Sequence, residues 1–191
     1  MEVAEMKERL LQLAETFAEQ EAHLTELDRA IGDGDHGVNM LRGFKALSNQ
    51  IDDSSMAQLF KSTGMTLMSQ IGGASGPLYG FSFVKMSQVV DDDFSKEQLP
   101  NVLEAFAEAV AQRGKVERGE KTMFDVIDRA REAVANDERV TLEVLQGYAQ
   151  DTVDLEATKG RAAYFKEESI GHMDPGAQSS VYILDALIGE V

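Results

Sequence analysis

The sequence lacks cysteine altogether and contains only three prolines in 191 residues. Without cysteine there can be no disulfide, no thiolate zinc site and no cysteine nucleophile. Because proline interrupts the interior of a helix, its scarcity leaves room for long helices. The composition therefore points away from thiol-based chemistry and permits a helical fold.

Basic residues are also scarce. The 18 lysines and arginines are outnumbered by 34 acidic residues, so the formal net charge is −16. Binding to nucleic acid or to anionic lipid relies on a basic surface, so this balance argues against both partners. The sequence has no run of about 18 apolar residues to span a membrane, and its acidic start lacks the features of a secretory signal. We therefore expect a cytoplasmic protein.

The rest of the composition is that of a globular protein. Apolar residues make up 43% of the sequence and charged residues 27%, close to the averages of folded domains. Since a domain holds roughly 150 residues, we expect residues 1–191 to form a single domain with one core.

Apolar residues recur at steps of three and four along the first 31 positions, which predicts an amphipathic helix of about eight turns. Its apolar stripe consists of Val3, Met6, Leu10, Leu13, Phe17, Leu24, Leu27 and Ile31. Similar spacing predicts seven more helices, at about 37–50, 55–71, 76–90, 96–113, 122–136, 140–158 and 176–189. Residues 81–90 resemble a strand in composition, but their length and lack of alternation favour a helix. With no β-hairpin signal, the predicted fold is all-α.

Glycines gather at the predicted helix junctions. Nine of the 16 lie between Gly32 and Gly80. A single glycine there is typical of a helix C-cap or a tight turn. The clusters at 32–37 and 72–76 are denser than capping requires, which indicates loops whose backbone approaches a ligand closely.

The segment from Asp28 to Gly37 carries the sharpest chemical signal. Asp28 lies in the last predicted turn of the first helix, and Asp33 and Asp35 alternate with glycines after it. Three carboxylates at a helix C-terminus repel one another and oppose the helix dipole, so a cation among them would favour the fold. Oxygen-only ligands suit Mg²⁺, and the spacing does not fit an EF-hand. The alternative is an ordinary acidic turn in an acidic protein.

Three other loops are compatible with an anionic ligand. The run from Gly72 to Pro77 resembles an anion-binding helix N-terminus, although it matches neither a Walker A motif nor a dinucleotide fingerprint. A plain turn with proline at the first helical position is its alternative. Arg161 is suited to bind a phosphate, or to end a helix favourably. Thr122 predicts a capping box, and the functional alternative is that the loop before it also frames the ligand. Asp174 predicts an N-cap before a proline.

Five segments in order resemble the nucleotide-binding L subunits of dihydroxyacetone kinase. They are LDRAIGDGDHGVNMLRGF, IGGASGPLYG, GKVERGEKTMFDV, ATKGRAAYF and SIGHMDPGAQSS, and they run from about Leu27 to Ser180. One glycine motif would be weak, but five ordered segments are highly specific. The resemblance implies eight antiparallel amphipathic helices forming a closed barrel, with the nucleotide held by loops at one end.

The resemblance also implies roles for individual residues. The positions matched to coordination of two Mg²⁺ ions, which bridge the nucleotide phosphates, are Asp28, Asp33 and Asp35. The positions matched to contacts with ADP or ATP are His36, Gly37, Val38, Asn39, Ala74, Ser75, Gly114, Thr122, Met123, Arg161, Asp174, Pro175 and Gly176.

The family that this chain resembles has two branches. Single-chain kinases join the domain to a K domain and use ATP. In the other branch, an L subunit keeps ADP bound, a phosphoprotein of the phosphotransferase system rephosphorylates it, and dihydroxyacetone is held on a separate K subunit. A 191-residue chain favours the second branch. An ATP-dependent subunit for another acceptor and a nucleotide-sensing regulator are the alternatives, and formation of a homodimer stays open.

Overall fold

The structure is a computed structural model that describes residues 1–91 and 94–189. Within these ranges it contains eight α-helices, three short 3₁₀ helices and no strand, which confirms the predicted all-α fold. The α-helices are α1 (Val3–Ile31), α2 (His36–Ala46), α3 (Met56–Gln70), α4 (Ser75–Met86), α5 (Leu99–Gly114), α6 (Met123–Ala135), α7 (Leu142–Gln150) and α8 (Pro175–Ile188). The 3₁₀ helices are η1 (Leu47–Asn49), η2 (Asp151–Asp154) and η3 (Ala162–Ser169).

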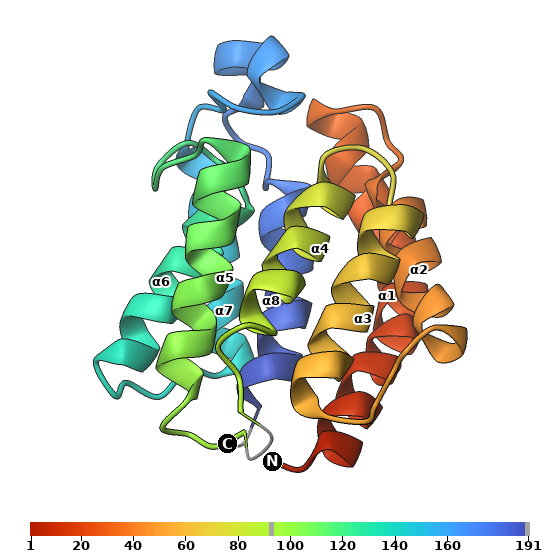
Figure 1. Cartoon of the computed structure of the whole chain (residues 1–191). Coiled ribbons are helices and arrows are strands. Elements are labelled where there is room, and N and C mark those ends of the chain that lie inside the picture. Colours follow the sequence, from red (N-terminus) through yellow and green to blue (C-terminus); the bar gives the residue numbers. More distant parts are fainter. Residues whose placement is uncertain (92–93, 190–191) are drawn as a thin grey trace.

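The helices run up and down, side by side (Figure 1). Each α-helix packs against the next one in the chain, and α8 packs against α1, α6 and α7. These contacts are compatible with the closed barrel that the resemblance implies. The start of α1 and the end of α8 lie at one end of the bundle, and α2, α4, α6 and α8 all begin at the opposite end (Figure 1).

One hydrophobic core runs through the bundle. The stripe predicted for the first helix is buried as expected, except that Val3 and Leu27 are half-buried. Aromatic rings join neighbouring helices: Phe17 packs on Phe44 with centroids 4.7 Å apart, and Phe60 meets the edge of Phe83 at 5.8 Å. Offset and edge-on ring pairs of this kind add stability beyond the apolar area they bury.

Two glycines inside helices allow α3 and α4 to pack closely. A side chain at Gly64 would collide with the carbonyl oxygen of Gly80, and a side chain at Gly80 would collide with that of Gly64. Close packing of backbones is a second use of glycine in this chain, besides the helix junctions that the sequence indicated.

The helix predicted for 140–158 is wrong in its second half, because α7 ends at Gln150 and only η2 continues it. The Thr152 hydroxyl donates to the carbonyl of Ala149 and accepts from the backbone N–H of Asp174. This competes with the helical bonding pattern. The caps predicted at Thr122 and Asp174 are confirmed, the first with a complete capping box. Ser55 and Thr141 cap α3 and α7 through their hydroxyls. None of the helices in the two described ranges has the length and apolar character needed to cross a membrane.

Candidate functional site

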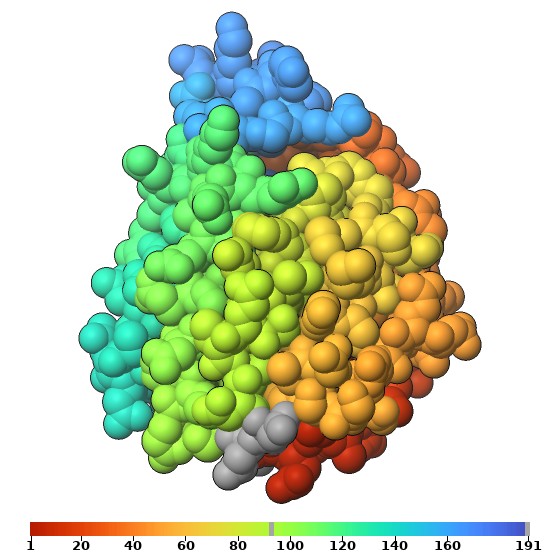
Figure 2. Space-filling view, in the orientation of Figure 1, coloured from red at the N-terminus to blue at the C-terminus, as the bar shows by residue number. Residues whose placement is uncertain are grey.

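A cleft of about 1190 Å³ opens at the end of the bundle where the even-numbered helices begin. The first residues of those four helices, His36, Ser75, Met123 and Pro175, all line it. Each helix N-terminus carries a partial positive charge. The segment around residues 160–170, blue in Figure 2, overhangs this end of the bundle. The architecture therefore directs four helix dipoles at one cleft, which suits an anionic ligand.

Three carboxylates meet at one side of the cleft. Asp28, Asp33 and Asp35 each place a carboxylate oxygen so that the three lie within 4.8 Å of one another. Asp28 is buried, and its Oδ2 accepts hydrogen bonds from the backbone N–H groups of Asp35 at 2.8 Å and His36 at 3.0 Å. Its Oδ1 lies where any side chain at position 32 would clash, so Gly32 is required there.

This carboxylate set fits a hard divalent cation. All three donors are carboxylate oxygens, which Mg²⁺ prefers, and they converge on one point from a helix end and the loop that follows. The guanidinium of Arg161 pairs with Asp33 at 2.9 Å from the exposed edge of the cleft. One exposed arginine neutralises at most part of three clustered negative charges.

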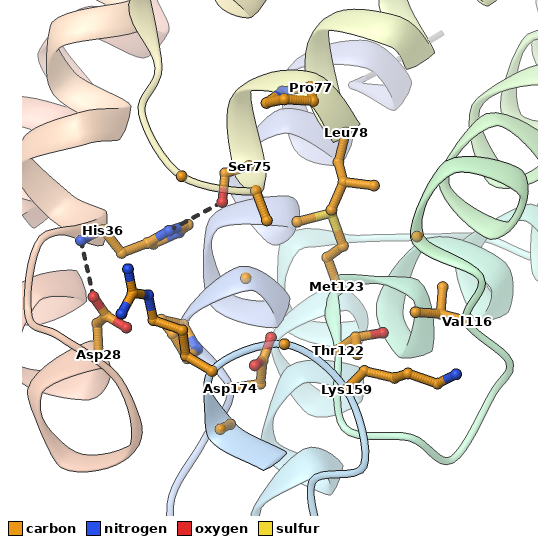
Figure 3. A pocket seen from close by; sticks show the side chains of 18 of the residues that line it. Asp28, His36, Ser75, Pro77, Leu78, Val116, Thr122, Met123, Lys159 and Asp174 are labelled. Atoms are coloured by element: carbon orange, nitrogen blue, oxygen red, sulfur yellow. Dashed lines mark hydrogen bonds between the residues drawn. The ribbon is translucent and has the colours of Figure 1, made fainter. Parts of the chain in front are cut away.

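His36 sits beside the carboxylates and is buried. Burial lowers its pKa from 6.5 to about 4, against the opposing effect of the nearby Asp28 and Asp35 carboxylates. The imidazole is therefore neutral at physiological pH. Its Nε2 lies 2.9 Å from the Ser179 hydroxyl, and its Nδ1 lies 3.3 Å from the Ser75 hydroxyl at the start of α4 (Figure 3).

The wall opposite the carboxylates is apolar. Leu78, Val116 and Met123 face Asp28 and His36 across the cleft (Figure 3). Gly114 lies behind them, where an added Cβ would contact both Leu78 and Val116. One side of the cleft thus suits metal and phosphate, and the other suits a flat apolar group such as a base.

The floor of the cleft contains two buried ionisable side chains, Asp174 and Lys121. Asp174 caps α8, because its Oδ2 accepts from the Ala177 N–H at 2.7 Å. Burial raises the pKa of Asp174 to about 7. Lys121 is completely buried, donates to the carbonyls of Thr152 and Val153, and has its pKa lowered by burial although Asp174 counteracts this.

Comparison with known proteins identifies the family of this chain. A family model described as the DAK2 domain matches residues 30–189. The chain belongs to the DAK2 domain family. It is 47% identical to the "PEP-dependent dihydroxyacetone kinase 1, ADP-binding subunit DhaL" of Listeria innocua, covering 91% of this chain and 89% of the relative. It is 42% identical to the "PTS-dependent dihydroxyacetone kinase, ADP-binding subunit DhaL" of Lactococcus lactis, covering 91% and 90%.

A solved structure shares the fold of this DAK2 domain. The crystal structure of the C. freundii dihydroxyacetone kinase in complex with AMP-PNP and Mg²⁺ matches with a TM-score of 0.71 and 25% identity. The match covers 98% of this chain but 34% of that chain, so the DAK2 domain spans about a third of the kinase.

Most residues predicted from the sequence line the cleft of the DAK2 domain. Two do not: Gly37 packs against α1, where a side chain would collide with the Glu21 carbonyl, and Val38 points outward with 47% of its surface exposed. The predicted residues that do line the cleft are Asp28, Asp33, Asp35, His36, Asn39, Ala74, Ser75, Gly114, Thr122, Met123, Arg161, Asp174, Pro175 and Gly176.

Sequence reasoning missed several cleft residues of the DAK2 domain, and Lys121 is the most informative. A lysine between a glutamate and a capping threonine in a polar loop looks solvent-exposed, so no signal in the sequence marks it as buried. Leu78 and Val116 were missed for a related reason, since isolated apolar residues near helix ends are typical of a core.

Proposed function

We propose that this chain is the ADP-binding subunit of a phosphoenolpyruvate-dependent dihydroxyacetone kinase. The observation that carries the proposal is the cluster of Asp28, Asp33 and Asp35 at a cleft where four helix N-termini converge. The two bacterial relatives named as ADP-binding subunits support it, because the match covers 89% and 90% of their lengths.

The apolar wall of the cleft and its helix N-termini suit different parts of a nucleotide. The base would lie against Leu78, Val116 and Met123, and the phosphates would lie toward Ser75 and the helix N-termini. Two Mg²⁺ ions would be held by the three aspartates and would supply the positive charge that phosphoryl transfer needs. Arg161 would add to that charge by turning from Asp33 to the phosphates.

The protein's own part in the reaction is to bind and align. In this proposal a phosphoprotein of the phosphotransferase system rephosphorylates the bound ADP, and the phosphoryl group passes to dihydroxyacetone held on a separate K subunit. Phosphoryl transfer depends on alignment and charge neutralisation more than on covalent chemistry by the protein. We therefore assign no nucleophile or general base to this chain.

The ligand that copurifies with the protein tests the proposal most directly. Mass spectrometry after denaturation should detect ADP or ATP. An empty site combined with millimolar affinity for nucleotide would refute the assignment. In a reconstituted system, phosphorylation of dihydroxyacetone should require the phosphoprotein. Transfer from free ATP alone would indicate an ATP-dependent kinase subunit, and binding without any transfer would indicate a regulator.

The metal assignment is tested by changing the carboxylates without changing their size. Asp33→Asn and Asp35→Asn should each weaken Mg²⁺-dependent binding of ADP by at least about tenfold, equivalent to about 1.4 kcal/mol. Asp137→Asn is the matched control, since Asp137 is an exposed carboxylate that pairs with Lys96 at the surface, away from the cleft. Unchanged binding and transfer in both cleft variants would show that the metal lies elsewhere.

A further inference from the structure

A line of four polar side chains connects the buried interior to the cleft. Tyr79 and Ser179 are completely buried, with their hydroxyl oxygens 2.8 Å apart. The Ser179 hydroxyl lies 2.9 Å from Nε2 of His36, and Nδ1 of the same ring lies 3.3 Å from the Ser75 hydroxyl. The line joins α2, α4 and α8, and Ser75 is its end at the cleft (Figure 3).

The protons of the line allow two hydrogen-bond patterns, which differ in the ring nitrogen of His36 that carries the proton. A neutral imidazole carries one N–H, and each hydroxyl carries one O–H. With the ring proton on Nε2, every group donates inward: Ser75 donates to Nδ1, and Tyr79 donates to the carbonyl of Gly176 at 3.1 Å. With the ring proton on Nδ1, every group donates outward, and the Ser75 hydroxyl keeps its proton for the cleft.

The inward arrangement needs no acceptor in the cleft. It ends on the Gly176 carbonyl, which also lies 3.1 Å from the Ser179 hydroxyl. The outward arrangement ends on the Ser75 proton, which needs an acceptor in the cleft. A phosphate oxygen is such an acceptor, because ionised phosphate accepts hydrogen bonds strongly.

We propose that Tyr79 and Ser179 are positioning residues that turn the Ser75 hydroxyl toward a nucleotide phosphate. On binding, the hydroxyls rotate with their own protons. The imidazole takes a proton from water at Nδ1 and releases its Nε2 proton to water, so it stays neutral. The ring changes from the Nε2–H to the Nδ1–H tautomer. This inference rests on the proposed function, since the nucleotide supplies the acceptor.

The tautomer of His36 is directly observable in the wild-type protein. The chain has only three histidines, so the ring nitrogens of His36 can be assigned by ¹⁵N NMR with a His36→Gln variant. We expect Nε2–H in the free protein and Nδ1–H in the complex with Mg-ADP, at one constant pH. The same tautomer in both states would overturn the inference. Failure of the wild type to bind Mg-ADP at all would instead refute the proposed function and with it this inference.

Variants measure how much the line contributes to binding. A neutral hydrogen bond contributes about 1 kcal/mol, so Tyr79→Phe and Ser179→Ala should each raise the Kd for Mg-ADP by about threefold to tenfold. Both should also hold His36 in the Nε2–H form in the complex. Tyr182→Phe is the matched control, because Tyr182 bonds to Gln178 and Gln20 away from the cleft. A Kd within twofold of wild type for both Tyr79→Phe and Ser179→Ala, whether or not they lose thermal stability, would show that the two residues do not position Ser75.

Discussion

Two buried groups in the cleft should give the metal-free and nucleotide-free protein opposite responses to acid. The pKa of His36 is lowered to about 4 and that of Asp174 is raised to about 7, each mainly by burial. For His36, the unfolded chain takes up a proton below pH 6.5 while the folded protein does not, so stability falls as the pH drops. For Asp174, the folded protein takes up a proton below pH 7 while the unfolded chain stays ionised to about 3.8, so stability rises.

The two effects have similar size between pH 7 and pH 5. A difference of one pKa unit corresponds to about 1.4 kcal/mol, so His36 should remove about 2 kcal/mol of stability over this interval, and Asp174 should add about 2 kcal/mol. In the wild type they nearly cancel. The Asp174→Asn variant keeps a side-chain acceptor for the Ala177 N–H but cannot titrate. The variant should therefore reveal the loss of stability that His36 causes between pH 7 and pH 5.

Urea denaturation at pH 7, 6 and 5 measures these contributions. Relative to the wild type, Asp174→Asn should lose about 2 kcal/mol of unfolding free energy on going from pH 7 to pH 5, and His36→Gln should gain about 2 kcal/mol. Other titrating groups contribute to all three proteins alike, so they drop out of the comparison. Stability curves for Asp174→Asn and wild type that run parallel within about 0.5 kcal/mol would refute the reasoning.

Two further predictions concern packing and charge. Gly37→Ala should cost about 1–3 kcal/mol in denaturant unfolding, because a side chain there collides with α1, whereas Gly147→Ala, which meets open space inside α7, should gain about 1 kcal/mol. Equal effects would show that α1 and α2 do not depend on this contact. Lys121→Met should cost about 1–3 kcal/mol because it leaves the buried Thr152 carbonyl without its donor, whereas Lys159→Met, whose side chain is partly exposed, should change stability by less than about 0.5 kcal/mol. A Lys121→Met protein as stable as the wild type would show that this carbonyl does not need the lysine ammonium.

The helices could be predicted because their signals are local. The apolar stripe of α1 repeats over 29 residues, so its burial follows from periodicity alone. The start of α6 is equally local, since Thr122 and Asp125 form a capping box within one turn. Periodicity and caps depend on residues three or four positions apart, and the sequence displays those directly.

Features that depend on distant contacts could not be predicted. The end of α7 depends on a bond between Thr152 and Asp174, which are 22 positions apart. The roles of Tyr79 and Ser179 depend on a contact across 100 positions. Both residues occupy the interior of predicted helices, where a buried tyrosine or serine looks like ordinary packing. Only the three-dimensional arrangement shows that their hydroxyls lead to the cleft.

An acidic protein that binds an anion must supply positive charge locally, and this one does so in two ways. Four helix N-termini converge on the cleft at fixed positions, and their partial charges do not alter the net charge of −16. The three aspartates repel phosphate unless a cation is bound between them. In the proposed function, metal and nucleotide must therefore raise each other's affinity, and linkage requires the factor to be the same in both directions. The acidic cluster thus favours the metal-bound nucleotide over the free one.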